Sequence, residues 1–140
     1  MRVYRIARQK WIGNVSGSGR PARWNKSGDF MLYASSSLAL ALLEMMVHLT
    51  RDQIPEYMWV AADLQQEWVD DASVPGIPPD PAGVGSAWLK RRGGKLALAV
   101  PSVIVPEKNY LLNPSHTDFS AVYWSTPQRL IIDPRLLRVQ

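Results

Sequence analysis

The segment from Leu38 to Leu49 constrains the fold more than any other part of the chain. Its residues are all Leu, Ala, Met or Val, except for Glu44 and His48. The serines just before it, residues 35–37, can cap the first turn of a helix. A helix that is apolar on every side must be covered by other elements, so we expect it to be buried and central. The segment is too short and too polar to span a bilayer.

The rest of the chain is predicted to be mainly strands. They are expected at residues 2–6, 31–34, 57–64 and 96–105 (the last interrupted at Pro101), with a closing hairpin of residues 122–124 and 130–132. A second, short helix is expected from Pro81 to Lys90, before a Gly-Gly pair. Because no regular helical crossovers connect the strands, we expect a single α+β domain, residues 1–140, with a mixed, mostly antiparallel sheet.

Composition excludes several kinds of chemistry. Of the 140 residues, 46% are hydrophobic and 20% charged, which is typical of a globular domain. The chain has no cysteine and two histidines without ligand spacing, so thiolate and metal catalysis are not expected. It also lacks a Walker motif and a GxGxxG turn that opens a helix.

The net charge of +4 favours anionic ligands or an acidic partner, but it is no nucleic-acid signature by itself. No signal peptide or membrane segment is expected, and a cysteine-free chain fits the cytoplasm.

Glu44 is the most informative residue, because an ionised carboxylate in an apolar helix is costly unless it is paired or faces a polar cavity. One structural interpretation pairs it with His48, which lies four residues on and on the same helix face. Another places both residues on a surface stripe. The functional interpretation makes Glu44 a catalytic carboxylate, and the segment alone does not separate the three.

Three more residues have both a structural and a functional interpretation. Arg23 precedes Trp24, so it is either a surface cation stacked on an aromatic ring or a fixed cation for phosphate or carboxylate oxygens. Tyr33 is either a core residue or a stacking platform beside a pocket. Ser102 follows Pro101, where its hydroxyl would otherwise bond its own backbone.

Several sequence blocks together resemble the RES domain, a family named for its arginine, glutamate and serine. The blocks lie in family order and cover nearly the whole chain. They are RVYRI at residues 2–6, RWN at 23–25, LYAS at 32–35, LALALLE at 38–44, VHL at 47–49, Gly85 with Trp88-Leu89, VPSVIVP at 100–106, NYLLNP at 109–114 and DPRL at 133–136. The VPS and NYLLNP blocks are the most specific.

This resemblance implies a fold similar to that of ADP-ribosyltransferases and a role as the toxin of a bacterial toxin–antitoxin pair. RES proteins consume NAD, as a substrate and not a bound cofactor, by breaking its nicotinamide–ribose bond. The family's active-site positions match Arg23, Tyr33, Glu44 and Ser102. In this view Glu44 stabilises the ribosyl cation, Arg23 holds the pyrophosphate with Arg5 as a helper, Tyr33 stacks on NAD, and Ser102 orients Glu44 or a ribose hydroxyl. The implied partner is an Xre-like DNA-binding antitoxin that blocks the cleft.

Other functions stay open at this point. The chain could transfer ADP-ribose to a protein, or water or phosphate could accept it. It could also be a non-catalytic module that binds a nucleotide, or an interaction protein that docks through its tryptophans. The sequence leaves the oligomeric state open, including a homodimer of the toxin within the antitoxin complex.

Overall fold

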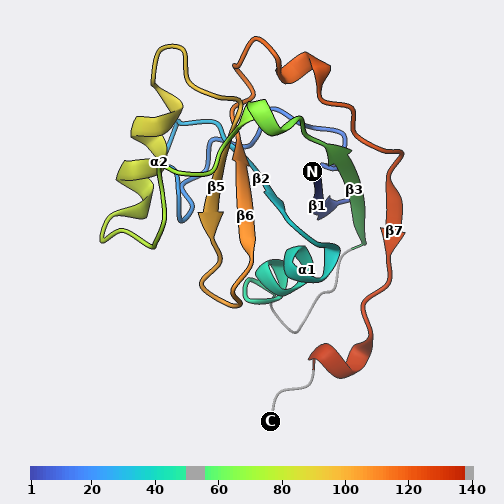
Figure 1. The fold of residues 1–140 in the computed structure, drawn as a ribbon. Coiled ribbons are helices and arrows are strands. Elements are labelled where there is room, and N and C mark those ends of the chain that lie inside the picture. The colour runs from blue at the N-terminus through green and yellow to red at the C-terminus, as the bar shows by residue number, and fades with distance from the viewer. Residues whose placement is uncertain (50–55, 138–140) are drawn as a thin grey trace.

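The computed structural model of the protein describes residues 1–49 and 56–137, and contains a seven-stranded sheet with the order β4-β5-β6-β2-β1-β3-β7 (Figure 1). The strands are β1 (Arg2–Arg8), β2 (Leu32–Ser35), β3 (Tyr57–Asp63), β4 (Val69–Asp70), β5 (Ala97–Pro101), β6 (Lys108–Leu112) and β7 (Gln128–Leu130). Only β4 and β5 pair in parallel, and the other neighbours are antiparallel. The predicted α+β class with a mixed, mostly antiparallel sheet is therefore confirmed.

The core lies on both faces of the sheet. Along β5, Ala97 and Ala99 belong to one apolar cluster, whereas Leu98 and Val100 belong to another. Neighbouring residues of a strand point to opposite faces, so β5 is covered on both sides. This explains why the strand is apolar at every position instead of alternating.

Helix α1 (Leu38–Met46) forms where the apolar segment predicts it. Its N-cap is Ser37, whose hydroxyl oxygen accepts a hydrogen bond from the Leu40 amide at 3.0 Å. The prediction that the helix is covered on all sides is wrong, because Leu40 and Ala41 are its buried residues and Leu43 is exposed. One face packs against β1 and β2, and the rest of the helix lies at the surface.

One strand prediction holds only for its first half, and another is wrong. The run from residue 96 to 105 ends as a strand at Pro101, and the chain then turns and returns as β6, which periodicity did not predict. The expected closing hairpin does not form either. Trp124 makes an isolated bridge to Ala62 and β7 pairs with Tyr57–Trp59, so both segments extend along β3 instead of pairing with each other.

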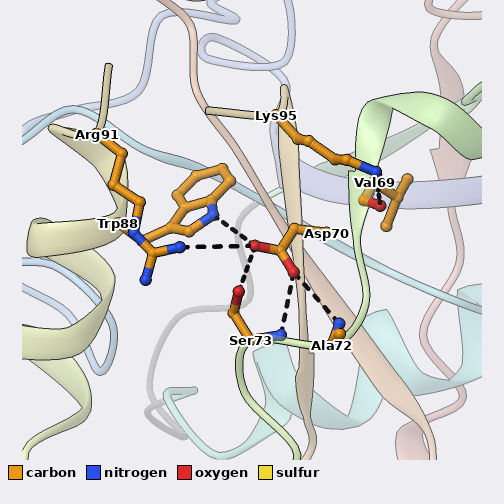
Figure 2. Close-up of polar contacts among 7 residues, drawn as sticks. All are labelled: Val69, Asp70, Ala72, Ser73, Trp88, Arg91 and Lys95. Atoms are coloured by element: carbon orange, nitrogen blue, oxygen red, sulfur yellow. Dashed lines mark hydrogen bonds and ion pairs between the residues drawn. The ribbon is translucent and has the colours of Figure 1, made fainter. Parts of the chain in front are cut away.

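Helix α2 (Pro81–Leu89) forms as predicted and lies beside β5 in Figure 1, away from the β7 edge. A polar contact ties it to the short edge strand β4 (Figure 2). Asp70 accepts hydrogen bonds from Trp88 Nε1 on α2 at 3.3 Å, from the Ser73 hydroxyl at 2.6 Å, and from the amides of Ala72 and Ser73. Arg91 adds an ion pair at 3.9 Å. This contact joins α2 to the sheet through a side chain rather than through backbone pairing.

Neither helix has the length and apolarity that a bilayer crossing requires, a result that covers residues 1–49 and 56–137.

Candidate active site

A cleft of about 920 Å³ opens beside α1. Its walls come from β1, β2, the first turn of α2, the loop that carries Arg23 and the turn after β5. Arg5, Arg23, Tyr33 and Glu44 all line this cleft, so the fold brings together four of the five predicted site residues. Ser102 is not among the residues that line the cleft, but its hydroxyl is hydrogen-bonded to the Glu44 carboxylate.

Glu44 is held by two donors from outside its own helix. The Ser102 hydroxyl donates to Glu44 Oε1 at 2.8 Å, and Asn109 Nδ2 donates to the same oxygen at 3.0 Å. Neither donor is His48, so the structure does not support the interpretation that pairs Glu44 with His48 along the helix face. The carboxylate is half-buried, and its two bonds fix the direction in which it faces the cleft.

The donors of Glu44 are fixed in turn by the sheet. Asn109 on β6 lies opposite Ser35 on β2, and the Ser35 hydroxyl donates to Asn109 Oδ1 at 2.7 Å. This bond orients the amide so that its nitrogen points to Glu44. Ser102 sits in the turn between β5 and β6, where its oxygen also accepts the Ile104 amide at 3.0 Å. The β5–β6 hairpin therefore supplies both groups that position the carboxylate.

Arg23 lies in a tight turn in which Ala22 and Asn25 form an isolated bridge. Its side chain is exposed and lines the cleft. No cation–π contact is found between Arg23 and Trp24 in the described residues, and Trp24 is buried in the core beneath the turn. The guanidinium is therefore available to an anion in the cleft.

Tyr33 lines the cleft, and its hydroxyl is engaged with the loop that carries Arg23. The oxygen accepts the Trp24 amide at 3.2 Å, and the hydroxyl hydrogen is donated to Asn25 Oδ1 at 2.5 Å. Burial raises the pKa of Tyr33 to about 12, so the phenol stays protonated at any neutral pH. The ring could stack on a ligand, while the hydroxyl holds the loop that carries Arg23.

Arg5 is only 9% exposed and uses its guanidinium mainly on backbone carbonyls. It donates to Ile12 O at 2.9 Å, to Asn14 O at 3.0 Å and to Trp11 O at 3.5 Å. Burial lowers the pKa of this guanidinium. Arg5 thus anchors the loop after β1 through its guanidinium, and the same residue forms part of the cleft wall.

The charges of the cleft suit an organic anion better than a metal ion. Arg5 and Arg23 supply positive charge, and Glu44 and Asp80 are the acidic residues on its walls. Asp80 is engaged as the N-cap of α2, where it accepts the Gly83 amide at 3.0 Å. Within the described ranges, no three His, Asp or Glu side chains gather closely enough to hold a metal.

Sequence reasoning missed Asn25 and Asn109 as parts of this site. Both stand in blocks used for the family resemblance, and Asn109 precedes three consecutive buried residues, Tyr110, Leu111 and Leu112. An amide at the edge of a buried run is a signal for a specific hydrogen bond. Its partner, Glu44, is 65 residues away in sequence, so spacing could not identify it.

Comparison with known proteins places the chain in a family. Residues 2–133 match the model of the RES domain. A "Prs ADP-ribosylating toxin" of Sphingobium sp. (strain YBL2) is 37% identical, covering 98% of this chain and 95% of that protein. A "Toxin Res" of Photorhabdus laumondii is 31% identical, covering 100% and 99%. A "Toxin Res" of Yersinia enterocolitica is also 31% identical, covering 97% and 99%.

A solved structure shares the fold. A chain in the crystal structure of the M. tuberculosis MbcT-MbcA toxin-antitoxin complex superimposes with a TM-score of 0.70. The alignment covers 97% of this chain and 86% of that chain at 17% sequence identity.

Proposed function

The chain belongs to the RES domain family, and from this premise we propose that it is the toxin of a bacterial toxin–antitoxin pair that degrades NAD by cleaving the nicotinamide–ribose bond. The observation that carries the proposal is the position of Glu44. A carboxylate on an otherwise apolar helix faces a cleft with two arginines and is held by Ser102 and Asn109.

The reaction breaks the bond between ribose C1′ and the nicotinamide nitrogen. The electron pair of that bond leaves with nicotinamide, which becomes neutral, and positive charge grows on the ribose as in glycoside cleavage. A carboxylate fixed beside the ribose stabilises that charge without reorganising. An acceptor then attacks C1′ and loses its proton. The Glu44 carboxylate would also accept a hydrogen bond from the 2′-hydroxyl of the ribose, and this bond would hold the ribose in place.

Arg23 fits the pyrophosphate of NAD. Its guanidinium can donate two parallel hydrogen bonds to phosphate oxygens, and its exposed position on the cleft wall leaves it accessible. Arg5 would contribute positive charge from deeper in the cleft. The Tyr33 ring would stack on the nicotinamide or ribose. No bound cofactor is needed in this scheme, since NAD is the substrate.

The acceptor of ADP-ribose separates two forms of this function. Water or phosphate would make the protein a glycohydrolase or phosphorylase. A protein acceptor would make it an ADP-ribosyltransferase, which the name of the Sphingobium relative favours. Both forms release nicotinamide, whereas a non-catalytic nucleotide-binding or interaction module releases none.

The partner in this proposal is an Xre-like DNA-binding antitoxin that covers the cleft. A neighbour of the same fold was solved in a toxin–antitoxin complex, which supports an antitoxin as the partner. We place the pair in the cytoplasm, where NAD and an antitoxin bound to DNA are both accessible. A homodimer of the toxin inside the complex is compatible with this arrangement.

The deciding experiment is to incubate the purified protein, freed of any partner, with NAD and to measure NAD loss and nicotinamide release. The matched control is Glu44→Gln, which keeps the shape and one acceptor oxygen but removes the charge. Its rate should fall roughly 10²- to 10³-fold, with a thermal midpoint close to that of the wild type. Mass spectrometry of the products then distinguishes free ADP-ribose, ADP-ribose phosphate and a modified protein. Equal rates for the two proteins would contradict the role of Glu44, and no nicotinamide release would contradict the enzymatic function.

A further inference from the structure

Asn25 lies at the centre of the loop that carries Arg23. It is 3% exposed, and its amide nitrogen donates to three backbone carbonyls of the same loop. The acceptors are Arg20 O at 2.9 Å, Asp29 O at 3.1 Å and Lys26 O at 3.3 Å. An amide with two hydrogens and three acceptors is fully used, so Asn25 closes residues 20–29 into one hydrogen-bonded unit.

The Tyr33 hydroxyl connects this unit to the sheet. It donates to Asn25 Oδ1 and accepts from the amide of Trp24. That amide belongs to the peptide group that joins Arg23 to Trp24. Strand β2 therefore holds the backbone on the carboxyl side of Arg23 through a single hydroxyl.

Helix α2 holds the same loop from the other side. The Ser86 hydroxyl oxygen accepts the Lys26 amide at 2.9 Å. Gly85 lies so close to the loop that a Cβ at that position would overlap the Trp24 carbonyl oxygen. The Arg23 loop is thus clamped between β2 and α2, although the Arg23 side chain itself is exposed.

We propose that Asn25 is a positioning residue for Arg23, and that Tyr33 serves the same purpose through its hydroxyl while its ring faces the cleft. The proposal deepens the function proposed above and relies on it for the identity of the ligand. An exposed arginine loses side-chain entropy when it binds an anion, and a mobile backbone would add to that cost. A loop fixed before binding removes the second cost, so NAD affinity depends on Asn25 and on the hydroxyl without either touching NAD.

The first test measures the loop itself and needs no NAD. Trypsin can cut after Arg23 and Lys26, whose side chains are exposed. The Tyr33 hydroxyl holds the peptide group after Arg23, and the Asn25 amide holds the Lys26 carbonyl. Tyr33→Phe removes one neutral hydroxyl and should raise the rate of cleavage at these two bonds roughly 3- to 10-fold, since cleavage tracks local opening. Asn25→Asp should raise it further, because the carboxylate keeps the acceptor for Tyr33 but loses the three donations.

Matched controls separate this effect from general loosening. Cleavage after Arg91 and Arg92 should stay at the wild-type rate in both variants. Tyr123→Phe and Asn113→Asp make the same chemical changes at positions outside the cleft, and should leave the cleavage after Arg23 unchanged. If Asn25→Asp does not fold, Tyr33→Phe still decides the question. Wild-type cleavage rates after Arg23 and Lys26 in Tyr33→Phe would overturn the proposal.

The second test asks whether the hydroxyl acts through Arg23 or on NAD. In a Glu44→Gln background, titration calorimetry with NAD should show affinity roughly 3- to 10-fold weaker for Tyr33→Phe. With Arg23→Ala added, Tyr33→Phe should cause no further loss, because the loop no longer carries the group it positions. Losses that multiply would mean that the hydroxyl contacts NAD directly, and would overturn the proposal. If the wild-type protein releases no nicotinamide from NAD, the proposed function fails, while the cleavage result still decides whether the loop is clamped.

Discussion

Ser102 donates its hydroxyl hydrogen to Glu44 Oε1 at 2.8 Å, across 58 residues of sequence. Asn109 donates to the same oxygen, so the hydrogen bonds within the described part of the chain leave Oε2 as the oxygen that can act on a ligand. Glu44 lines the cleft, and a carboxylate that is anchored through one oxygen is preorganised for electrostatic stabilisation of a cation.

Replacing Ser102 by alanine should therefore lower kcat more than it changes KM. A hydrogen bond to a charged group contributes about 1.5–3 kcal/mol, so kcat for nicotinamide release should fall roughly 10- to 100-fold. Ser102 does not line the cleft, so KM should stay within about twofold. Steady-state kinetics measure both constants, with Ser115→Ala as a control at an exposed serine. A raised KM with unchanged kcat would instead make Ser102 a ribose-binding residue.

Arg23→Lys should weaken NAD binding although the charge is kept. Lysine loses the planar fork that contacts two phosphate oxygens at once, and one lost charge-assisted bond corresponds to a roughly 10- to 100-fold rise in Kd. Titration calorimetry on Glu44→Gln protein gives the value. Arg92→Lys, a change at an exposed arginine outside the cleft, is the control. An unchanged Kd would show that Arg23 is a surface cation without a role in NAD binding.

Gly85→Ala should destabilise the protein, contrary to the usual effect of this change in a helix. Alanine in place of glycine ordinarily favours a helix by about 1 kcal/mol. At this position the new Cβ would overlap Trp24 O, so α2 and the Arg23 loop must move apart. We expect a lower thermal midpoint, with a loss of about 1–3 kcal/mol, and weaker NAD binding. Gly13→Ala, where a Cβ meets nothing within 4 Å, should leave both unchanged.

Asp70→Asn should reduce stability at neutral pH but not in acid. Partial burial would raise the pKa of the Asp70 carboxyl, but the hydrogen bonds from Ser73, Ala72 and Trp88 outweigh it, and the pKa lies below its ordinary value. A lowered pKa in the folded state adds stability above the unfolded value of about 3.9, and that stability is lost as pH falls through the folded pKa. Urea unfolding at pH 7 should therefore separate the two proteins, and the difference should shrink below pH of about 4. An equal difference at both pH values would contradict the charge-based account, and Asp118→Asn at an exposed carboxylate is the control.

Co-expression with a neighbouring antitoxin should give an inactive complex. The chain carries a net charge of +4, so an acidic segment that enters the cleft would associate faster at low salt than at high salt. Gel filtration identifies the complex and the NAD assay measures its activity. A complex that keeps full activity would contradict occlusion of the cleft without affecting the enzymatic proposal.

The sequence predicted the parts of this molecule whose signals are local. The capped helix at Leu38, the Pro81 helix and the first strand all follow from short-range patterns, and the family resemblance selected Glu44 and Ser102, which the fold brings together. The exposure of Leu43 could not be predicted, because it depends on which elements pack against α1. The pairing of β7 with β3 depends on partners about 70 residues apart, and residue spacing does not record such contacts.

The strand order has a consequence for how the protein is made. Arg23, Tyr33 and Glu44 leave the ribosome early, whereas the two donors that orient Glu44 follow 58 and 65 residues later. One of them lies on β6, which must insert between β5 and β2 to complete the sheet. On the proposed function, a nascent chain therefore carries Glu44 before that carboxylate is aligned, and NAD cleavage has to wait until synthesis has passed the β5–β6 hairpin. The proposed antitoxin would then have the time of that synthesis in which to be present before the cleft can act.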